Sequence, residues 1–556
     1  MQSPPLSDTT PRTTHTKPNT IMPDTPYTPT DRFEELDRID LAGVFDLLDI
    51  YCRNLLPDME ACLVFLSRIL RDPAAQSHPR TRDEATRLLR KTLTFGPFHI
   101  QGLELAHGLT HDPALAERIR RLRGFALDPA LADPRSTMSD ERVFERRRTR
   151  LLELLEQKPG HVLAASHLLH LDACRGLKSD WLARFTVPQF ARAQWNQRLF
   201  MHHAATGDTA CALALWPAVA KEAVCEVQLN FAAELFAAMG DTARAMECYT
   251  RSLALDPAQT PARLRLAEMA NPTKADATLP DRRDVTICIY TWNKGDHLER
   301  TLASLARTNM GRAKIRILLN GCTDHSATVA EAARALFTGR DFGVITLPVN
   351  VGAPAARNWL GALPEVRASE YVAYIDDDVE MPEDWLAHFL TVMERHPRTA
   401  VVGCKVVFGS DPRMIQYLYR ALALARPDII KLTDPCQIAQ MDCGHYDFVR
   451  ETDTVMGCCH LLRTASMPEG PQFDLRYSPS QIDDIAHDLS LRLKGHEVRY
   501  CGLVKCLHHQ NTGGGFKRRM TDAQLGQVLG NDMKFFYFFR DRLDRIQTVM
   551  AGSLPG

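Results

Sequence analysis

Three consecutive aspartates, Asp376, Asp377 and Asp378, directly follow the apolar run YVAYI. Carboxylates at the end of an apolar strand repel one another and lower stability unless a cation or a basic group compensates their charge. Hard carboxylate oxygens are the ligands that Mg²⁺ and Mn²⁺ prefer, and these ions are commonly shared with substrate phosphates. The cluster therefore predicts a site for a divalent ion; taken alone, it would also fit a solvated acidic turn.

Polar side chains also follow three other apolar runs. Thr291, Trp292 and Asn293 come after VTICIY, Asp324 closes the turn NGCTD after KIRILL, and Arg357 lies in a helix that begins after VITLPV. An exposed indole suits stacking on a nucleobase, whereas a loop aromatic can also pack on its own domain. A helix N-terminus with a guanidinium suits a diphosphate. Together with the aspartates, these loops favour a metal site that serves a phosphate-bearing ligand.

The elements that carry these loops alternate between two periodicities. The runs VTICIY, KIRILL, VITLPV and YVAYI are strand-like, and HLERTLASLART, SATVAEAARALF and AARNWLGAL are helix-like. Such alternation indicates a parallel α/β sheet. Because ligands bind at the carboxyl ends of the strands in these sheets, we expect the polar loops to meet at one edge.

The preceding region, about 31–274, is predicted to be helical throughout. Apolar residues recur at spacings of three and four, as in DLAGVFDLLDIYCRNLL. One internal repeat is specific: GDTACALALW begins at Gly207, and GDTARAMECY begins 33 residues later at Gly240. Small residues at a helix crossing, Gly at the turn and an aromatic on the second helix make a hairpin that stacks on its copy. This pattern resembles the tetratricopeptide repeat.

Several motifs in the α/β region occur in a fixed order. They are IYTWN, NGCTD, the run N-x-G-x-x-x-A-R-N from Asn350 to Asn358, IDDDVEMPEDWL, VMGCCHLLRTAS and DLSLRLKG. On these motifs, residues 283 to about 510 resemble a family 2 glycosyltransferase with a GT-A fold. The predicted fold class is therefore multidomain, with an all-α helical-repeat domain followed by an α/β GT-A domain.

The resemblance implies transfer of a sugar from a nucleotide-sugar donor, usually with inversion, and dependence on Mn²⁺ or Mg²⁺. Trp292 would stack on the base, Asp376 would lie near the ribose and phosphates, and Asp378 would hold the metal. The predicted donor-binding residues are Thr291, Trp292, Asn293, Asp324, Arg357, Asp376 and Asp377. Leu319 stands where the family has an aspartate that contacts the base, and Tyr290 replaces the usual proline. The first departure argues against the usual uracil contact, but not against nucleotide binding.

The general base is predicted from the segment QIDDIAHDLSLR. An inverting displacement needs a carboxylate to take the acceptor's proton. The family places a Glu-Asp pair at positions that are Ile485 and Ala486 here, whereas an acidic pair lies two residues earlier. Asp484 and Asp488 are four residues apart and share one face of a helix. We favour Asp484 as the base, with Asp488 as the alternative or as a supporting acid.

A histidine after the last sheet strand often completes the metal site in this family. His508 and His509 follow the mostly apolar run CGLVKCL. Because neighbouring side chains point in different directions, one of the two should face the metal and the other should be structural. We prefer His509 as the ligand, together with Asp376 and Asp378. The basic run NTGGGFKRR comes next and would either close over the donor phosphates or serve as a plain linker.

Composition restricts the remaining classes of function. The 556 residues carry 67 Lys and Arg against 68 Asp and Glu, a balance that argues against nucleic acid as a partner. The 15 cysteines lack a recurring zinc spacing and are expected to be reduced. No signal-peptide pattern begins the chain, and no run reaches the ~18 apolar residues of a transmembrane segment. We expect a cytoplasmic location, with peripheral attachment at the inner face of the membrane as an alternative.

The domain boundaries follow from these patterns. Residues 1–30 are predicted to be a disordered Pro/Thr-rich tail, 31–274 the helical domain, 281–520 the GT-A domain, and 521–556 a C-terminal helix. The helical domain is expected to hold a protein partner or the acceptor, since stacked hairpins form concave surfaces. The acceptor is then a protein, a lipid-linked precursor or another glycan. The competing hypothesis is a non-catalytic scaffold with a degenerate glycosyltransferase domain.

Overall fold

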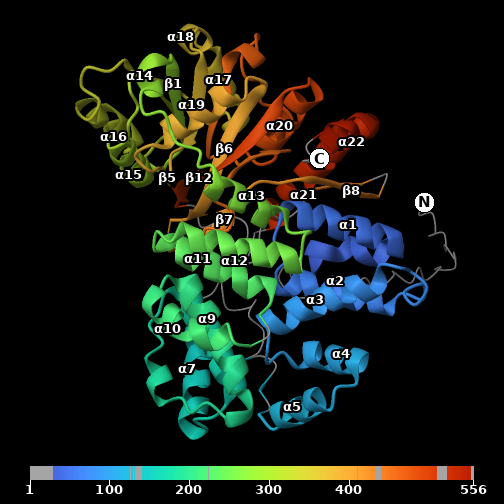
Figure 1. The fold of residues 1–556 in the computed structure, drawn as a ribbon. Coiled ribbons are helices and arrows are strands. Elements are labelled where there is room, and N and C mark those ends of the chain that lie inside the picture. Colours follow the sequence, from blue (N-terminus) through green and yellow to red (C-terminus); the bar gives the residue numbers. More distant parts are fainter. Residues whose placement is uncertain are drawn as a thin grey trace, which may run out of the picture.

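The structure is a computed structural model that describes residues 29–125, 127–128, 131, 141–222, 224–409, 411–426, 429–432, 440–509 and 522–552. Most of the predicted tail at 1–30 and all of the basic run at 511–519 lie outside these residues. Two regions are distinguished in Figure 1: a helical N-terminal half and a sheet flanked by helices.

The N-terminal half is helical, which confirms the predicted class of this region. Its α-helices are α1 (Leu41–Asn54), α2 (Met59–Arg71), α3 (Thr81–Phe95), α4 (Ile100–Thr110), α5 (Pro113–Arg123), α7 (Glu141–Gln157), α8 (Val162–Arg175), α9 (Arg192–Thr206), α10 (Thr209–Val219), α11 (Glu226–Ala238), α12 (Thr242–Leu255) and α13 (Thr260–Ala270). Among its 3₁₀ turns is η1 (Pro29–Arg38).

The repeat found in the sequence corresponds to two similar helical hairpins, α9–α10 and α11–α12. Gly207 and Gly240 turn each pair with the same left-handed backbone, φ 78°. The aspartate after each glycine caps the next helix. Ala212 and Ala245 are fully buried where the helices cross, as their small size predicts.

The second half contains a mixed sheet whose strand order is β10-β12-β6-β11-β4-β1-β2-β3. Strands β1, β2, β3 and β4 are parallel, as predicted, whereas β11 runs antiparallel between β4 and β6. The strands are β1 (Val285–Thr291), β2 (Lys314–Asn320), β3 (Phe342–Leu347), β4 (Tyr371–Asp376), β5 (Val379–Glu380), β6 (Thr399–Phe408), β7 (Asp411–Tyr417), β8 (Leu422–Arg426), β9 (Ile429–Leu432), β10 (Val449–Thr452), β11 (Cys459–Arg463) and β12 (Glu497–His508).

Helices cover both faces of this sheet because successive strand residues point to opposite sides. On β4, Tyr374 packs in the cluster that contains Leu360 of α17, whereas Ile375 packs with Trp385 of α19. The helices are α14 (Leu279–Arg282), α15 (Gly295–Leu305), α16 (Ser326–Ala332), α17 (Ala353–Ala362), α18 (Pro364–Arg367), α19 (Trp385–Arg395) and α20 (Asp483–Leu493). The C-terminal segment forms α21 (Asp522–Phe539) and α22 (Leu543–Gly552) rather than one helix.

The two halves share one hydrophobic cluster. Buried residues of α1 and α2 pack in the same cluster as Ile415, Tyr419 and Tyr446 of the sheet half. Hydrogen bonds cross this contact: the Tyr419 hydroxyl donates to the Asn54 carbonyl, and the Leu56 N–H donates to the Tyr446 hydroxyl at 3.1 Å. The segment between the halves is also packed, since the Asp276 N–H donates to Thr391 Oγ1 at 2.9 Å. The polar segment between the two predicted domains is therefore part of the folded body.

No helix among the described residues combines the length and the apolar character that a membrane crossing requires.

Candidate active site

The polar loops lie together at the carboxyl edge of the parallel strands. Strand β1 pairs with β2 on one side and with β4 on the other, and the pairing reaches Thr291 opposite Leu319 and Tyr290 opposite Asp376. The loops after these three strands are therefore neighbours. This arrangement follows from the strand order and places Thr291 and Asp376 on adjacent strands.

A histidine and an aspartate at this edge lie in contact. His508 Nδ1 lies 3.0 Å from the amide oxygen of Gln416, and its Nε2 lies 3.1 Å from Asp378 Oδ1. Both side chains are buried. An imidazole nitrogen and a carboxylate oxygen are both ligand types of divalent transition-metal ions.

The residues present fit a divalent ion. Ligand atoms of Asp376, Asp378 and His508 lie within 4.8 Å of one another. Two ligands at right angles around one ion, each ~2.1 Å from it, are about 3 Å apart, which matches the His508–Asp378 separation. The Gln416 contact behind His508 is the kind of outer hydrogen bond that fixes the tautomer of a metal-binding imidazole.

His509, the histidine preferred from the sequence, lies elsewhere. Its Nε2 is 2.7 Å from Glu380 Oε1, and its Nδ1 is 3.1 Å from an Arg300 nitrogen. The structure thus brings His508, and not His509, to the aspartates. The register explains the difference: His508 is the last residue of β12 and pairs with Val379, so its side chain is directed by the pleat, whereas His509 lies beyond the strand.

Lys294 occupies the space beside the aspartates. Its ammonium group donates to Asp378 Oδ2 at 2.8 Å and to Asp377 Oδ1 at 3.2 Å. Burial raises the pKa of Asp377 to about 6, and the negative charge of Asp378 adds to this effect while Lys294 opposes it. The lysine is thus the internal cation that compensates this carboxylate cluster.

Two of the predicted donor-binding residues fasten the loops. Asn293, with φ 53°, accepts through Oδ1 from the N–H of Thr323 at 2.7 Å. Asp324 accepts from the N–H of Gly295 at 2.9 Å and from that of Ser326 at 3.0 Å, which caps α15 and α16. These bonds join the loop after β1 to the loop after β2.

Trp292 and Thr291 differ in their exposure to solvent. The Trp292 side chain is 53% exposed, so its face is open to a ligand at the strand ends. Thr291 is 1% exposed and belongs to the floor of the site. The stacking role of Trp292 stays a prediction, for which its indole is accessible, whereas Thr291 can reach a ligand only through its neighbours.

Arg357 lies beneath the site. The guanidinium is buried, and it contacts Asp483 at 2.6 Å and Asp376 at 3.5 Å. It also lies over the rings of Tyr290 and Phe473, 5.2 Å from each centroid. Its charge is therefore engaged by two carboxylates and two aromatic rings.

The two candidate bases have different environments. Asp484 is partly exposed, and its Oδ2 accepts from the Gly457 N–H at 2.9 Å, next to the segment that pairs with β4. Asp488 is fully buried and accepts from the Val455 N–H at 3.0 Å. Burial raises the pKa of Asp488 well above its usual range. The geometry leaves Asp484 open to an acceptor and gives Asp488 a supporting position.

Sequence reasoning missed three residues of this site. Lys294 directly follows the Thr-Trp-Asn motif, and a basic residue so close to a predicted acidic cluster was an available signal. Asp483 was recognised as acidic but not as the partner of Arg357, which is 126 residues away in the chain. The choice of His508 depended on strand register, for which the sequence held no direct signal.

Comparison with known proteins agrees with this architecture. Residues 286–454 match the model of the glycosyl transferase family 2, so this part of the chain is similar to that family. No curated protein sequence matches the chain. The match covers the strand-end loops and stops before α20.

Two solved structures that match the chain are distant in sequence. One is the S. aureus TarS fragment 1–349, with 15% identity over 39% of this chain and 60% of that chain, and a TM-score of 0.29. Another is the mannosyltransferase PcManGT from Pyrobaculum calidifontis in complex with GDP-Man and Mn²⁺, with 13% identity over 55% of this chain and 86% of that chain, and a TM-score of 0.32. The chain thus covers less than two thirds of the TarS fragment.

Proposed function

We propose that this protein transfers a sugar from a nucleotide-sugar donor to an acceptor hydroxyl with the help of a divalent ion, Mn²⁺ or Mg²⁺. The observation that carries the proposal is the Asp376, Asp378 and His508 cluster, in which ligand atoms of the three side chains lie within 4.8 Å of one another and His508 Nε2 is 3.1 Å from Asp378 Oδ1. When bound there, the ion would neutralise the charge that grows on the leaving diphosphate.

The chain's own residues hold the donor around this cluster. Trp292 offers an open aromatic face for the base. Asn293 and Asp324 keep the two loops in place, and Asp376 lies between the metal site and Arg357. Lys294 is the one mobile cation of this set: its side chain is 40% exposed, so it can leave Asp377 and Asp378 and turn to a phosphate.

Asp484 would act as the general base. It lies on the first turn of α20, adjacent to Asp483, and Arg357 connects that aspartate to Asp376. A carboxylate in this position can take the proton of an acceptor hydroxyl on the side of the donor opposite to the leaving group, which implies inversion. Asp488 would support the loop that carries Gly457.

The helical half would bind the acceptor. It packs directly on the segments 413–420 and 445–450, so an acceptor held there remains attached to the catalytic half through a rigid contact. Stacked hairpins suit an extended partner such as a protein or a glycan chain. The shared hydrophobic cluster means that surface substitutions, and not removal of residues 1–270, are the sound test of this role.

The test is donor turnover. The full-length protein is incubated with a panel of nucleotide sugars with and without Mn²⁺, and release of the nucleoside diphosphate is measured. We expect metal-dependent hydrolysis of one donor and its loss in Asp378→Asn. A protein that binds no nucleotide sugar and hydrolyses none, while it remains folded, would favour the scaffold hypothesis instead.

A further inference from the structure

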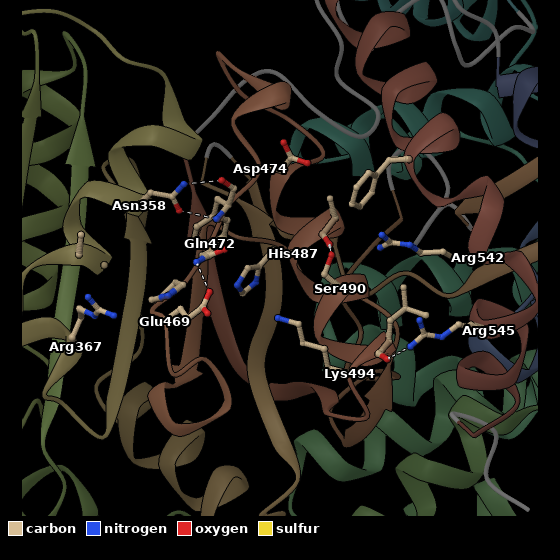
Figure 2. Close-up of a pocket in the computed structure, with 17 residues that line it drawn as sticks. Asn358, Arg367, Glu469, Gln472, Asp474, His487, Ser490, Lys494, Arg542 and Arg545 are labelled. Atoms are coloured by element: carbon tan, nitrogen blue, oxygen red, sulfur yellow. Dashed lines mark hydrogen bonds between the residues drawn. The ribbon is translucent and has the colours of Figure 1, made fainter.

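A large cavity lies on the opposite side of Arg357 from the aspartates. Its volume is about 800 Å³, within the range of small-molecule sites. It is bounded by α17 and α18, by the segment 469–474, by α20 and by the C-terminal helices. Figure 2 shows this cavity and the side chains that line it. None of the residues assigned above to the metal, the donor or the base lines it.

Four cationic side chains surround the cavity. Arg367 lies on one side, Lys494 near the middle, and Arg542 and Arg545 on the other side (Figure 2). Among the residues that the structure describes, Arg367, Lys494 and Arg542 form no ion pair. Arg545 donates only to the carbonyl of Leu493, at 2.9 Å. Cations that line one cavity without ion-pair partners repel one another, so an anion would stabilise the arrangement.

The acidic residues of the lining do not neutralise these cations. Asp474 is engaged by Arg476, which lies outside the cavity lining. Glu469 accepts from the side chain of Gln472 at 3.2 Å and is the remaining negative charge. With Asp474 paired, the lining carries an excess of positive charge.

The floor of the cavity is aromatic and rigid. His487 is 6% exposed and stacks on Phe473, with 4.5 Å between the ring centroids. Burial lowers the pKa of His487 to about 4, so the ring is neutral and adds no charge. Asn358 fixes the backbone of Phe473 through two hydrogen bonds of 2.7 Å each. A ligand thus meets flat, apolar surface below and cations at the rim.

We propose that this cavity binds an organic phosphate, with the phosphate among Lys494, Arg542 and Arg545 and the rest of the molecule on the floor of Phe473 and His487. Guanidinium groups bind phosphate oxygens through paired hydrogen bonds, which favours a phosphate over a single carboxylate at a site with several arginines. The Phe473 ring also contacts Arg357, so an occupant would lie one side chain away from the catalytic carboxylates. This proposal does not depend on glycosyl transfer.

The ligand chemistry has two sources, a soluble phosphorylated metabolite or the headgroup of a phospholipid. The primary experiment is calorimetric titration of the full-length protein with inorganic pyrophosphate in a metal-free buffer with EDTA. The double substitution Lys494→Glu/Arg542→Glu reverses two charges at the cavity, and Arg540→Glu is the matched control. Arg540 lies on the same segment but outside the lining, where it packs on Tyr537. Asp378→Asn removes any contribution of the donor site.

We expect the wild-type protein, Arg540→Glu and Asp378→Asn to bind pyrophosphate with similar affinity, and the double variant to bind at least about tenfold more weakly. In parallel, sedimentation with phosphatidylcholine vesicles that contain phosphatidic acid identifies the source. If the wild-type protein sediments with the vesicles and the double variant does not, the ligand is a lipid headgroup. If the wild-type protein binds free pyrophosphate but does not sediment with the vesicles, the ligand is a soluble phosphate.

Two outcomes would overturn the proposal. One is a wild-type protein that binds neither probe. The other is a double variant that binds pyrophosphate as tightly as the wild type does, or that loses no more affinity than Arg540→Glu does. Pyrophosphate binding would then reflect the overall charge of the protein and not the cavity. Lys494, Arg540 and Arg542 are exposed, whereas Asp378 is buried, and the thermal melting of every variant reports whether the fold is retained.

Discussion

Lys294 should compete with the divalent ion for the aspartates. Its ammonium donates to carboxylates of Asp377 and Asp378, whose side chains are 8% and 3% exposed, whereas Lys294 itself is 40% exposed. An ion that binds to Asp378 must displace this contact or tolerate a positive charge a few ångströms away. Replacement by methionine keeps the length and apolar stem of the side chain and removes the charge.

The size of the effect follows from the two contacts. Partly exposed ion pairs contribute roughly 0.2–1 kcal/mol each, so the combined loss of the two contacts on metal binding costs about 0.4–2 kcal/mol. Since 1.4 kcal/mol corresponds to a factor of ten, Lys294→Met should bind Mn²⁺ about 2- to 30-fold more tightly than the wild type. The measurement is titration of donor-free protein with Mn²⁺, followed by the loss of the free-ion paramagnetic resonance signal.

A matched lysine provides the control. Lys314 contacts Asp284 at 2.8 Å at the other end of the sheet, and Lys314→Met should leave Mn²⁺ affinity unchanged. If Lys294 turns to the donor phosphates, Lys294→Met should also raise the KM for the donor. Unchanged or weaker Mn²⁺ binding in Lys294→Met would refute the competition, whatever happens to turnover.

The remaining predictions concern the base, the histidine ligand and acid sensitivity. Asp484→Asn keeps the bond to the Gly457 N–H but cannot take a proton. Its kcat should therefore fall by roughly 10²–10⁴-fold, while its affinities for Mn²⁺ and for the donor stay unchanged. If Asp484→Asn turns over almost normally and Asp488→Asn is strongly impaired, Asp488 is the base. His508→Gln should weaken Mn²⁺ binding by roughly tenfold or more, measured by the same titration, whereas His509→Gln should not. Burial lowers the pKa of His170 to about 3, so the stability it contributes is complete above pH 6.5 and is lost as the pH falls toward 3, by up to ~1.4 kcal/mol per pH unit. In His170→Asn, the free energy of unfolding should therefore change less steeply between pH 6 and 4, by up to ~1.4 kcal/mol per pH unit. Urea denaturation of the variant and of the wild type at each pH measures this difference.

The strands and the loops that follow them were predictable because they rest on local patterns. Apolar runs of β-type alternating with helical periodicity specified a parallel sheet, and the sheet itself brought the loops after β1, β2 and β4 to one edge. The aspartates and the open Trp292 follow from the same rule. The repeat was predictable too, since Gly207 and Gly240 both require the left-handed backbone that glycine adopts without strain.

What could not be predicted depends on pairs of residues that are distant in the chain. Whether His508 or His509 reaches the metal site depends on the register of β12 against β5. The segment 271–284 is polar and gave no sign of a partner, but the Asp276 N–H donates to Thr391 Oγ1. The contact between the two halves had no sequence signal either, because nothing in the apolar residues around Tyr419 and Tyr446 indicates that they pack with α1 and α2.

Arg357 shows how such a distant pair changes the interpretation of a motif. A helix N-terminus with an arginine suggested direct binding of the diphosphate, yet the guanidinium is buried between Asp376 and Asp483. An isolated guanidinium in this position would be costly to bury, and so would either carboxylate without it, so the three groups stabilise one another. Asp376 belongs to the proposed metal site and Asp483 precedes the candidate base Asp484, so one arginine sets the distance between these two parts of the site. Its contact with Phe473 extends the same connection to the floor of the basic cavity. In the proposed reaction, the motif would therefore act through this fixed spacing rather than through a direct bond to the phosphates.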